Sequence, residues 1–97
     1  MVKVQIIADR DEVTPLIQSA ILAEIKRLEL GLHKTQKAIR KFEEKYRISS
    51  EIFLRDYAAE DLDGGDAEYI EWAGELDIQQ DILEDLRKLQ AIEYVAQ

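Results

Sequence analysis

A long run of apolar residues at alternating steps of four and three places the strongest limit on the fold of this chain. The run begins at Ile21 and ends at Tyr46. Apolar residues at this spacing line one side of an α-helix, as they do in a coiled coil. The run therefore predicts one long helix whose seam packs against another helix. The seam consists of Ile21, Ile25, Leu28, Leu32, Thr35, Ile39, Phe42 and Tyr46.

Local signals set the ends of this helix. Thr14 fits an N-cap, and Pro15, the only proline, fits the first helical position. The seam continues through Gly31, where packing must outweigh a cost of about 1 kcal/mol for glycine in a helix interior. We predict a helix over residues 15–47, about 50 Å long if it is continuous. Residues 2–7 alternate between apolar and polar side chains and are expected to be extended.

Two further helices are expected after the long one. The serine pair at residues 49–50 supplies an N-cap for a short helix over residues 50–61. A double glycine at residues 64–65 marks a tight turn, and Asp66 then caps a third helix over residues 66–95. The apolar residues of the third helix form two neighbouring stripes: Tyr69, Trp72, Leu76, Gln79, Leu83 and Leu86 in one, and Ile78, Ile82, Leu89 and Ile92 in the other.

Charge is divided unevenly between the two halves of the chain. Residues 1–47 contain ten basic and seven acidic residues, for a net charge of +3, whereas residues 48–97 contain three and fourteen, for a net charge of −11. Long-range attraction between the halves favours an antiparallel arrangement of the two long helices, although each exposed pair contributes only about 0 to 1 kcal/mol. We therefore predict an all-α fold in which residues 1–97 form a single helical domain. It is a long antiparallel helical hairpin with a short intervening helix and a short N-terminal extended segment.

The size of the chain favours association with a second copy. A domain of 97 residues buries only roughly 60 to 65% of the surface that its unfolded chain exposes. Such a thin helical unit commonly completes its burial in a dimer, here a helical bundle. The expected oligomer seam is Ile21, Ile25, Leu28, Leu32, Ile39 and Phe42.

Composition excludes most kinds of chemistry. The chain has no cysteine and one histidine, His33, which is too few for a zinc site or a catalytic triad. Asp66 and Trp72 stand where an EF-hand needs its glycine and its glutamate, so no metal and no cofactor is expected. We therefore do not expect this chain to be an enzyme.

The net charge of −8 disfavours binding to nucleic acid. The absence of a long apolar run predicts a cytoplasmic protein without a membrane partner.

Four aromatic residues flank the acidic turn: Phe53, Tyr57, Tyr69 and Trp72. Aromatic side chains of this type dominate protein–protein contacts when they are partly exposed, and they close a core when they are buried. The sequence is compatible with both roles. The expected partner-binding residues are Phe53, Tyr57, Tyr69, Trp72, Leu76 and Leu83.

About half of the chain resembles a known family. The segments 41–54 (KFEEKYRISSEIFL) and 69–75 (YIEWAGE) are similar to small archaeal and cyanobacterial antitoxin-like proteins of toxin–antitoxin pairs. Their pattern "FEEKYGMSSEEF" has glycine where this chain has Arg47 and glutamate where it has Ile52. The resemblance implies a protein that neutralises a basic partner toxin, such as a ribonuclease, by direct binding.

Two other functions stay open at this level. A self-assembling structural protein would use the same seams to pair only with its own copies. A DNA-binding regulator could present Lys3 and Gln5 of a paired N-terminal strand to a major groove, but the first helix is far longer than such regulators use.

Overall fold

Helices dominate the structure, a computed structural model that describes residues 2–5 and 13–95. The predicted all-α class is confirmed, because the two strands contribute only four residues each. The elements in chain order are β1 (Val2–Gln5), α1 (Val13–Tyr46), α2 (Ser50–Asp56), a 3-10 turn η1 (Ala59–Asp61), α3 (Gly65–Gln90) and β2 (Ile92–Val95).

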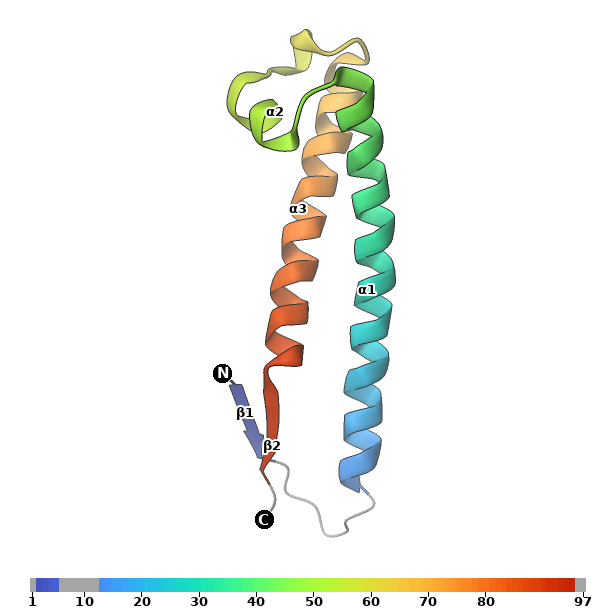
Figure 1. Ribbon diagram of the computed structural model, residues 1–97, viewed down its shortest axis with the longest axis vertical. Helices are drawn as coiled ribbons and strands as arrows, with labels where there is room; N and C mark the ends of the chain where they lie inside the picture. The colour runs from blue at the N-terminus through green and yellow to red at the C-terminus, as the bar shows by residue number, and fades with distance from the viewer. Residues whose placement is uncertain (1, 6–12, 96–97) are drawn as a thin grey trace.

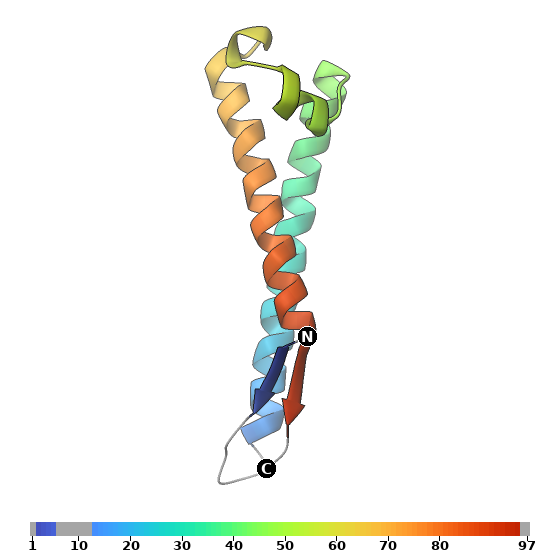
Figure 2. The ribbon, with the colours of Figure 1, turned by 90° about the vertical axis from the view of Figure 1, so that its left-hand side faces the viewer.

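The two long helices, α1 and α3, lie side by side and run in opposite directions (Figure 1). They diverge toward one end of the molecule, where α2 and the chain around η1 lie across them (Figure 2). The molecule is a rod with extents of 60 × 20 × 18 Å and a radius of gyration of 19.0 Å. A compact domain of this length would have a radius of gyration of about 13 Å. Long stretches of both helices therefore have only one neighbouring helix.

Helix α1 begins at Val13, two residues before the predicted start. Pro15 consequently lies inside the first turn, where a backbone N–H has no intrahelical acceptor and its loss is harmless. The helix continues through Gly31, and a Cβ at that residue would lie 3.5 Å from Cδ1 of Ile82, an ordinary contact. It ends at Tyr46, one residue before the predicted end.

Helix α2 is shorter than predicted. Its cap is the expected one, because the Ser49 hydroxyl accepts a hydrogen bond from the Ile52 N–H at 3.2 Å. The helix ends at Asp56 rather than residue 61, and the next residues are extended. A separate 3-10 turn follows because the Asp61 carboxylate accepts a hydrogen bond from the Ala58 N–H at 2.8 Å, which stabilises a new turn at that point.

Helix α3 begins at the double glycine, and the prediction that Asp66 caps it is wrong. Gly65 has a φ of 59°, in the left-handed region that favours glycine, and Gly64 occupies the cap position without a side-chain hydrogen bond. The Glu68 carboxylate fills the space beside Gly64, where a Cβ would collide with it. The turn geometry therefore takes the place of an aspartate cap.

The predicted C-terminal end of the third helix is also wrong. Helix α3 ends at Gln90, and residues 92–95 form β2, which pairs with β1 in parallel register. The segment is rich in β-branched and aromatic residues, which favour a strand once a second strand is available to pair with it. The expected extended conformation of residues 2–7 agrees with β1 over 2–5, and residues 6–7 lie outside the described residues.

The core lies at the end of the rod that carries α2. It consists of Phe42, Phe53, Leu62 and Trp72, with further half-buried side chains around it. Away from this end, the buried residues among those that the structure describes form a line between α1 and α3. These are Leu28, Thr35, Ile39 and Leu86.

Candidate protein-binding surface

An aromatic stack fixes α2 on the two long helices. The rings of Phe53 and Trp72 are parallel within 2° with centroids 3.9 Å apart, and both side chains have no exposed surface. Phe42 and Tyr46 of α1 stack against Trp72 with centroid distances of 5.5 and 5.9 Å. The four stacked rings join α1, α2 and α3 at this end of the rod.

A hydrogen-bond relay satisfies the polar atoms beside this stack. The Trp72 indole Nε1 donates to Ser50 Oγ at 2.9 Å, and Ser50 Oγ donates to Glu43 Oε2 at 2.9 Å. The same Glu43 oxygen also accepts the Ser50 backbone N–H at 2.9 Å. Because the indole is buried, Ser50 supplies an acceptor that water cannot replace. The relay ties one side chain of each helix to the others.

A second polar contact closes the turn before α3. The Glu68 carboxylate accepts hydrogen bonds from Lys45 Nζ at 2.7 Å and from the Tyr46 hydroxyl at 2.9 Å. The Lys45 ammonium, and next the Tyr46 hydroxyl, lower the pKa of Glu68 below its ordinary value. Glu68 in turn raises the pKa of Lys45. The contact lies at the surface, so it contributes orientation more than stability.

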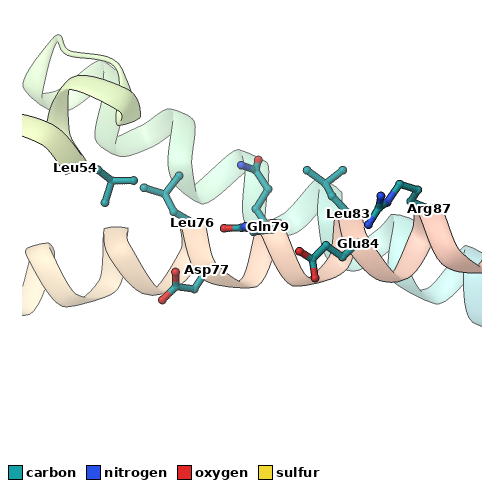
Figure 3. A pocket seen from close by; sticks show the side chains of 8 residues that line it. Leu54, Leu76, Asp77, Gln79, Leu83, Glu84 and Arg87 are labelled. Atoms are coloured by element: carbon teal, nitrogen blue, oxygen red, sulfur yellow. The ribbon is translucent and has the colours of Figure 1, made fainter.

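Below α2, the surface of α3 opens into a groove of about 520 Å³. Leu54 of α2 and Leu76 of α3 point toward one another at the end of the groove nearer α2, and Leu83 continues the apolar surface along α3 (Figure 3). Leu54 is 55% exposed and Leu83 is 46% exposed. Large apolar side chains at this exposure, gathered in one groove, are typical of an interaction surface.

The charges along this groove are mainly negative. Asp77 and Glu84 contribute carboxylates, and Arg87 contributes the one cation among the lining residues. The half of the chain that contains α2 and α3 has a net charge of −11. An apolar floor with acidic edges is complementary to an apolar helix face flanked by lysine or arginine.

The structure divides the residues predicted to bind a partner. Phe53 and Trp72 are completely buried and present no surface to a partner, so for these two the core role applies. Tyr57 and Tyr69 are half-buried against the core. Leu76 and Leu83 line the groove.

The residues of the predicted oligomer seam face the other long helix of the same chain. Leu28, Ile39 and Phe42 are buried, and a second copy therefore cannot contact them while α3 stays in place. Ile21 and Ile25 are half-buried at the opposite end of the rod, where they line a second groove with residues of α3 and β2. Leu32 is half-buried on the same side of α1.

The sequence did not predict the roles of two residues, Leu54 in the groove and Leu62 in the core. Leu54 lines the groove because it lies beside Phe53 on the outer side of a short helix, and a seven-residue helix has too few turns to show an apolar stripe. Leu62, in the turn before α3, is 5% exposed and belongs to the core. Its position in a turn rich in glycine and aspartate hides that role, since such residues are typical of solvated turns.

The described part of the chain contains no group of three or more His, Asp or Glu residues placed to hold a metal ion. His33 lies exposed on α1. Among the helices of residues 13–90, none is long and apolar enough to cross a membrane.

Comparison with protein-family models, with curated proteins and with solved structures found no match to this chain.

Proposed function

We propose that this chain is a non-enzymatic protein-binding module of the antitoxin kind, which acts in the cytoplasm by binding and neutralising a basic partner protein. The observation that carries the proposal is the open groove of Leu54, Leu76 and Leu83 with Asp77 and Glu84 at its edges. The aromatic stack above it holds the groove in a fixed shape, which lowers the entropy cost of binding.

The occupant that fits this groove is a helix of the partner with an apolar stripe and basic flanks. Two exposed leucines and a half-buried one supply the apolar contact, as in other helix-in-groove complexes. The net charge of −8 speeds encounter with a basic protein and repels acidic ones. A basic ribonuclease toxin meets this description, since the surface that it uses for RNA must attract negative charge.

The test is capture of the partner from the native cells with matched variants. Tagged wild-type protein, Leu83→Glu and Ile70→Glu are purified at low salt and at high salt, and co-purifying proteins are identified by mass spectrometry. Ile70 is 69% exposed on α3 and does not line the groove, so Ile70→Glu makes the same chemical change at the wrong place.

The proposal is supported if a basic protein co-purifies with the tagged wild-type chain in stoichiometric amount at low salt and is released at high salt. The same protein must be absent with Leu83→Glu and present with Ile70→Glu. Its activity, such as RNA cleavage, must be inhibited by the wild-type chain and not by Leu83→Glu. Recovery of the tagged chain with only its own copies would refute the antitoxin proposal and favour a self-assembling structural protein.

A further inference from the structure

A row of lysines on α1 borders a groove between the two long helices. The groove has a volume of about 410 Å³. Its lining residues are Lys34, Lys37, Ala38, Lys41, Phe42 and Lys45 of α1 and Glu68 and Glu71 of α3. One side of the groove is therefore basic and the other is acidic.

Most of these charges have no countercharge within the chain. Lys45 and Glu68 form an ion pair across the groove, with 2.7 Å between Nζ and Oε1. Among the described residues, the other three lysines of the groove and Glu71 form no ion pair. The groove thus retains unmatched charges of both signs.

The unmatched charges lie in two rows of like sign. Lys37 and Lys41 are four residues apart on α1, and Glu71 and Glu75 are four residues apart on α3. Residues at this spacing are neighbours on a helix surface, where like charges repel and destabilise the helix. Countercharges from outside the chain would remove the repulsion in both rows.

The ion pair across the groove fixes which residues of the two rows lie at the same level. Lys41 lies four residues before the lysine of that pair, and Glu71 lies three residues after the glutamate. Because the helices are antiparallel and both rise by about 1.5 Å per residue, these two residues are level to within about 1.5 Å. The same count places Lys37 level with Glu75.

We propose that this face is the contact between two copies of the chain, related by a two-fold axis parallel to the rod. Rotation about that axis leaves every residue at its own level and places α1 of each copy over α3 of the other. The rows at Lys37 and Lys41 then meet the rows at Glu71 and Glu75 of the second copy. Each row of one sign is opposite a row of the other sign, in both contacts.

The charge pattern identifies a second copy as the occupant. A nucleic acid or an acidic helix would be attracted by the lysines and repelled by Glu71, and a purely basic protein would be repelled by the lysines. The matching surface has a basic row and an acidic row on neighbouring antiparallel helices, which is the pattern of this chain. Single exposed ion pairs contribute little, but aligned rows act together.

Both rows continue into exposed apolar side chains. Leu30 precedes Lys34 by one turn of α1 and is 71% exposed, and Ile78 follows Glu75 by about one turn of α3 and is 47% exposed. Covering these side chains adds apolar burial to the charge contacts.

The contact leaves the groove below α2 free. Helix α2 lies to one side of the two long helices (Figures 1 and 2). It lines the groove of Leu54 and Leu83, but none of its residues lines the lysine groove. A dimer through the lysine groove can therefore still bind another protein.

The experiment measures the mass of the purified full chain by light scattering and sedimentation, from about 1 µM to about 500 µM. The expected species is twice 11.2 kDa. Two charge-reversed proteins are compared with it, Lys37→Glu with Lys41→Glu, and Glu71→Lys with Glu75→Lys. Each should raise the dissociation constant at least about 30-fold, because four contacts change from attraction to repulsion.

Mixing the two charge-reversed proteins in equal amounts should restore the dimer. The new glutamates on α1 of one protein then face the new lysines on α3 of the other. The second contact of that mixed dimer has wild-type lysines opposite wild-type glutamates. A foreign acidic or basic partner predicts no such recovery in a mixture of purified proteins.

A matched control reverses two charges on another side of α3. Asp77→Lys with Glu84→Lys makes the same change in net charge in the groove below α2 and should leave the dimer unchanged. Circular dichroism checks that each variant keeps its helices. Lys37→Gln with Lys41→Gln removes charge without adding repulsion and should raise the dissociation constant about 5-fold, so the contact is tested even if a reversed variant unfolds.

A wild-type chain that stays monomeric at the highest concentration overturns the proposal. So does a dimer that survives both charge reversals, a mixture of the reversed proteins that stays monomeric, or a control variant that is disrupted as strongly. A dissociation constant that does not rise between about 0.05 M and 1 M NaCl also overturns it, because salt screens such contacts. None of these outcomes depends on the client proposed above, since the measurements use the purified chain alone.

Discussion

The relay from Trp72 through Ser50 to Glu43 can be tested with a double-mutant cycle of Ser50→Ala and Trp72→Phe. Ser50→Ala removes the acceptor of an indole N–H that is buried under Phe53. A buried donor without an acceptor costs about 1 to 3 kcal/mol, so we expect Ser50→Ala to destabilise the protein by about 2 kcal/mol.

Trp72→Phe keeps a ring in the stack but removes the donor and part of the buried area. It should cost about 2 kcal/mol, less than the 3 to 5 kcal/mol typical of truncating a buried tryptophan to alanine. In that background the indole N–H no longer needs Ser50, so Ser50→Ala should cost only about 0.5 to 1 kcal/mol. The expected coupling between the two sites is therefore about 1 to 2 kcal/mol.

Urea unfolding followed by helical circular dichroism measures all four proteins with one probe. A domain of this length has a stability of about 5 to 15 kcal/mol, so each single variant should remain folded at 25 °C. Each kcal/mol corresponds to about 4 to 8 °C in melting temperature, which gives a drop of about 8 to 16 °C for Ser50→Ala. The control is Leu54→Ala at a 55% exposed position, which should change stability by about 0.5 kcal/mol or less.

The outcome that would falsify this reasoning is additivity. If Ser50→Ala costs the same with phenylalanine as with tryptophan at position 72, the hydroxyl does not stabilise the fold through the indole. The stack alone would then hold α2 in place.

Two further predictions concern the turns on either side of α2. Arg47 has a φ of 55°, a region that costs a non-glycine residue about 1 to 2 kcal/mol, and so Arg47→Gly should raise stability by about 0.5 to 1 kcal/mol after the entropy of glycine is subtracted. Thermal unfolding checks this, with Glu44→Gly in the last turn of α1 as the destabilising control, and a lower melting temperature for Arg47→Gly would contradict it. Because Lys45 lowers the pKa of Glu68, this carboxylate stabilises the fold above its unfolded pKa, and the contribution disappears as the pH falls from about 5 toward 3. The melting temperatures of wild type and Glu68→Gln should therefore differ at pH 7 and converge near pH 3; a difference that stays constant with pH would exclude an ionic role for Glu68.

Position 47 has a backbone conformation that favours glycine. Arg47 adopts a left-handed conformation directly after α1, which is the usual place for glycine after a helix. A residue other than glycine at this position therefore has a cost in stability. Glycine would adopt the same left-handed conformation without strain.

The sequence determined the long first helix and the start of α2. The three–four spacing from Ile21 to Tyr46 requires a helix with an apolar side whatever its neighbour is, because the period is a property of the helix alone. The cap at Ser49 is equally local, since the hydroxyl and the Ile52 N–H that donates to it are three residues apart. Signals confined to a few residues can be read without knowing the fold.

Only the tertiary structure decided which surfaces were left uncovered. Ile92 fits the apolar stripe of α3, yet it belongs to a strand because β1, far away in the chain, lies beside it. Trp72 and Leu83 share one stripe, but α2 covers the first and leaves the second 46% exposed. An apolar stripe predicts that its side chains pack against another apolar surface. Which element supplies that surface depends on contacts between distant parts of the chain.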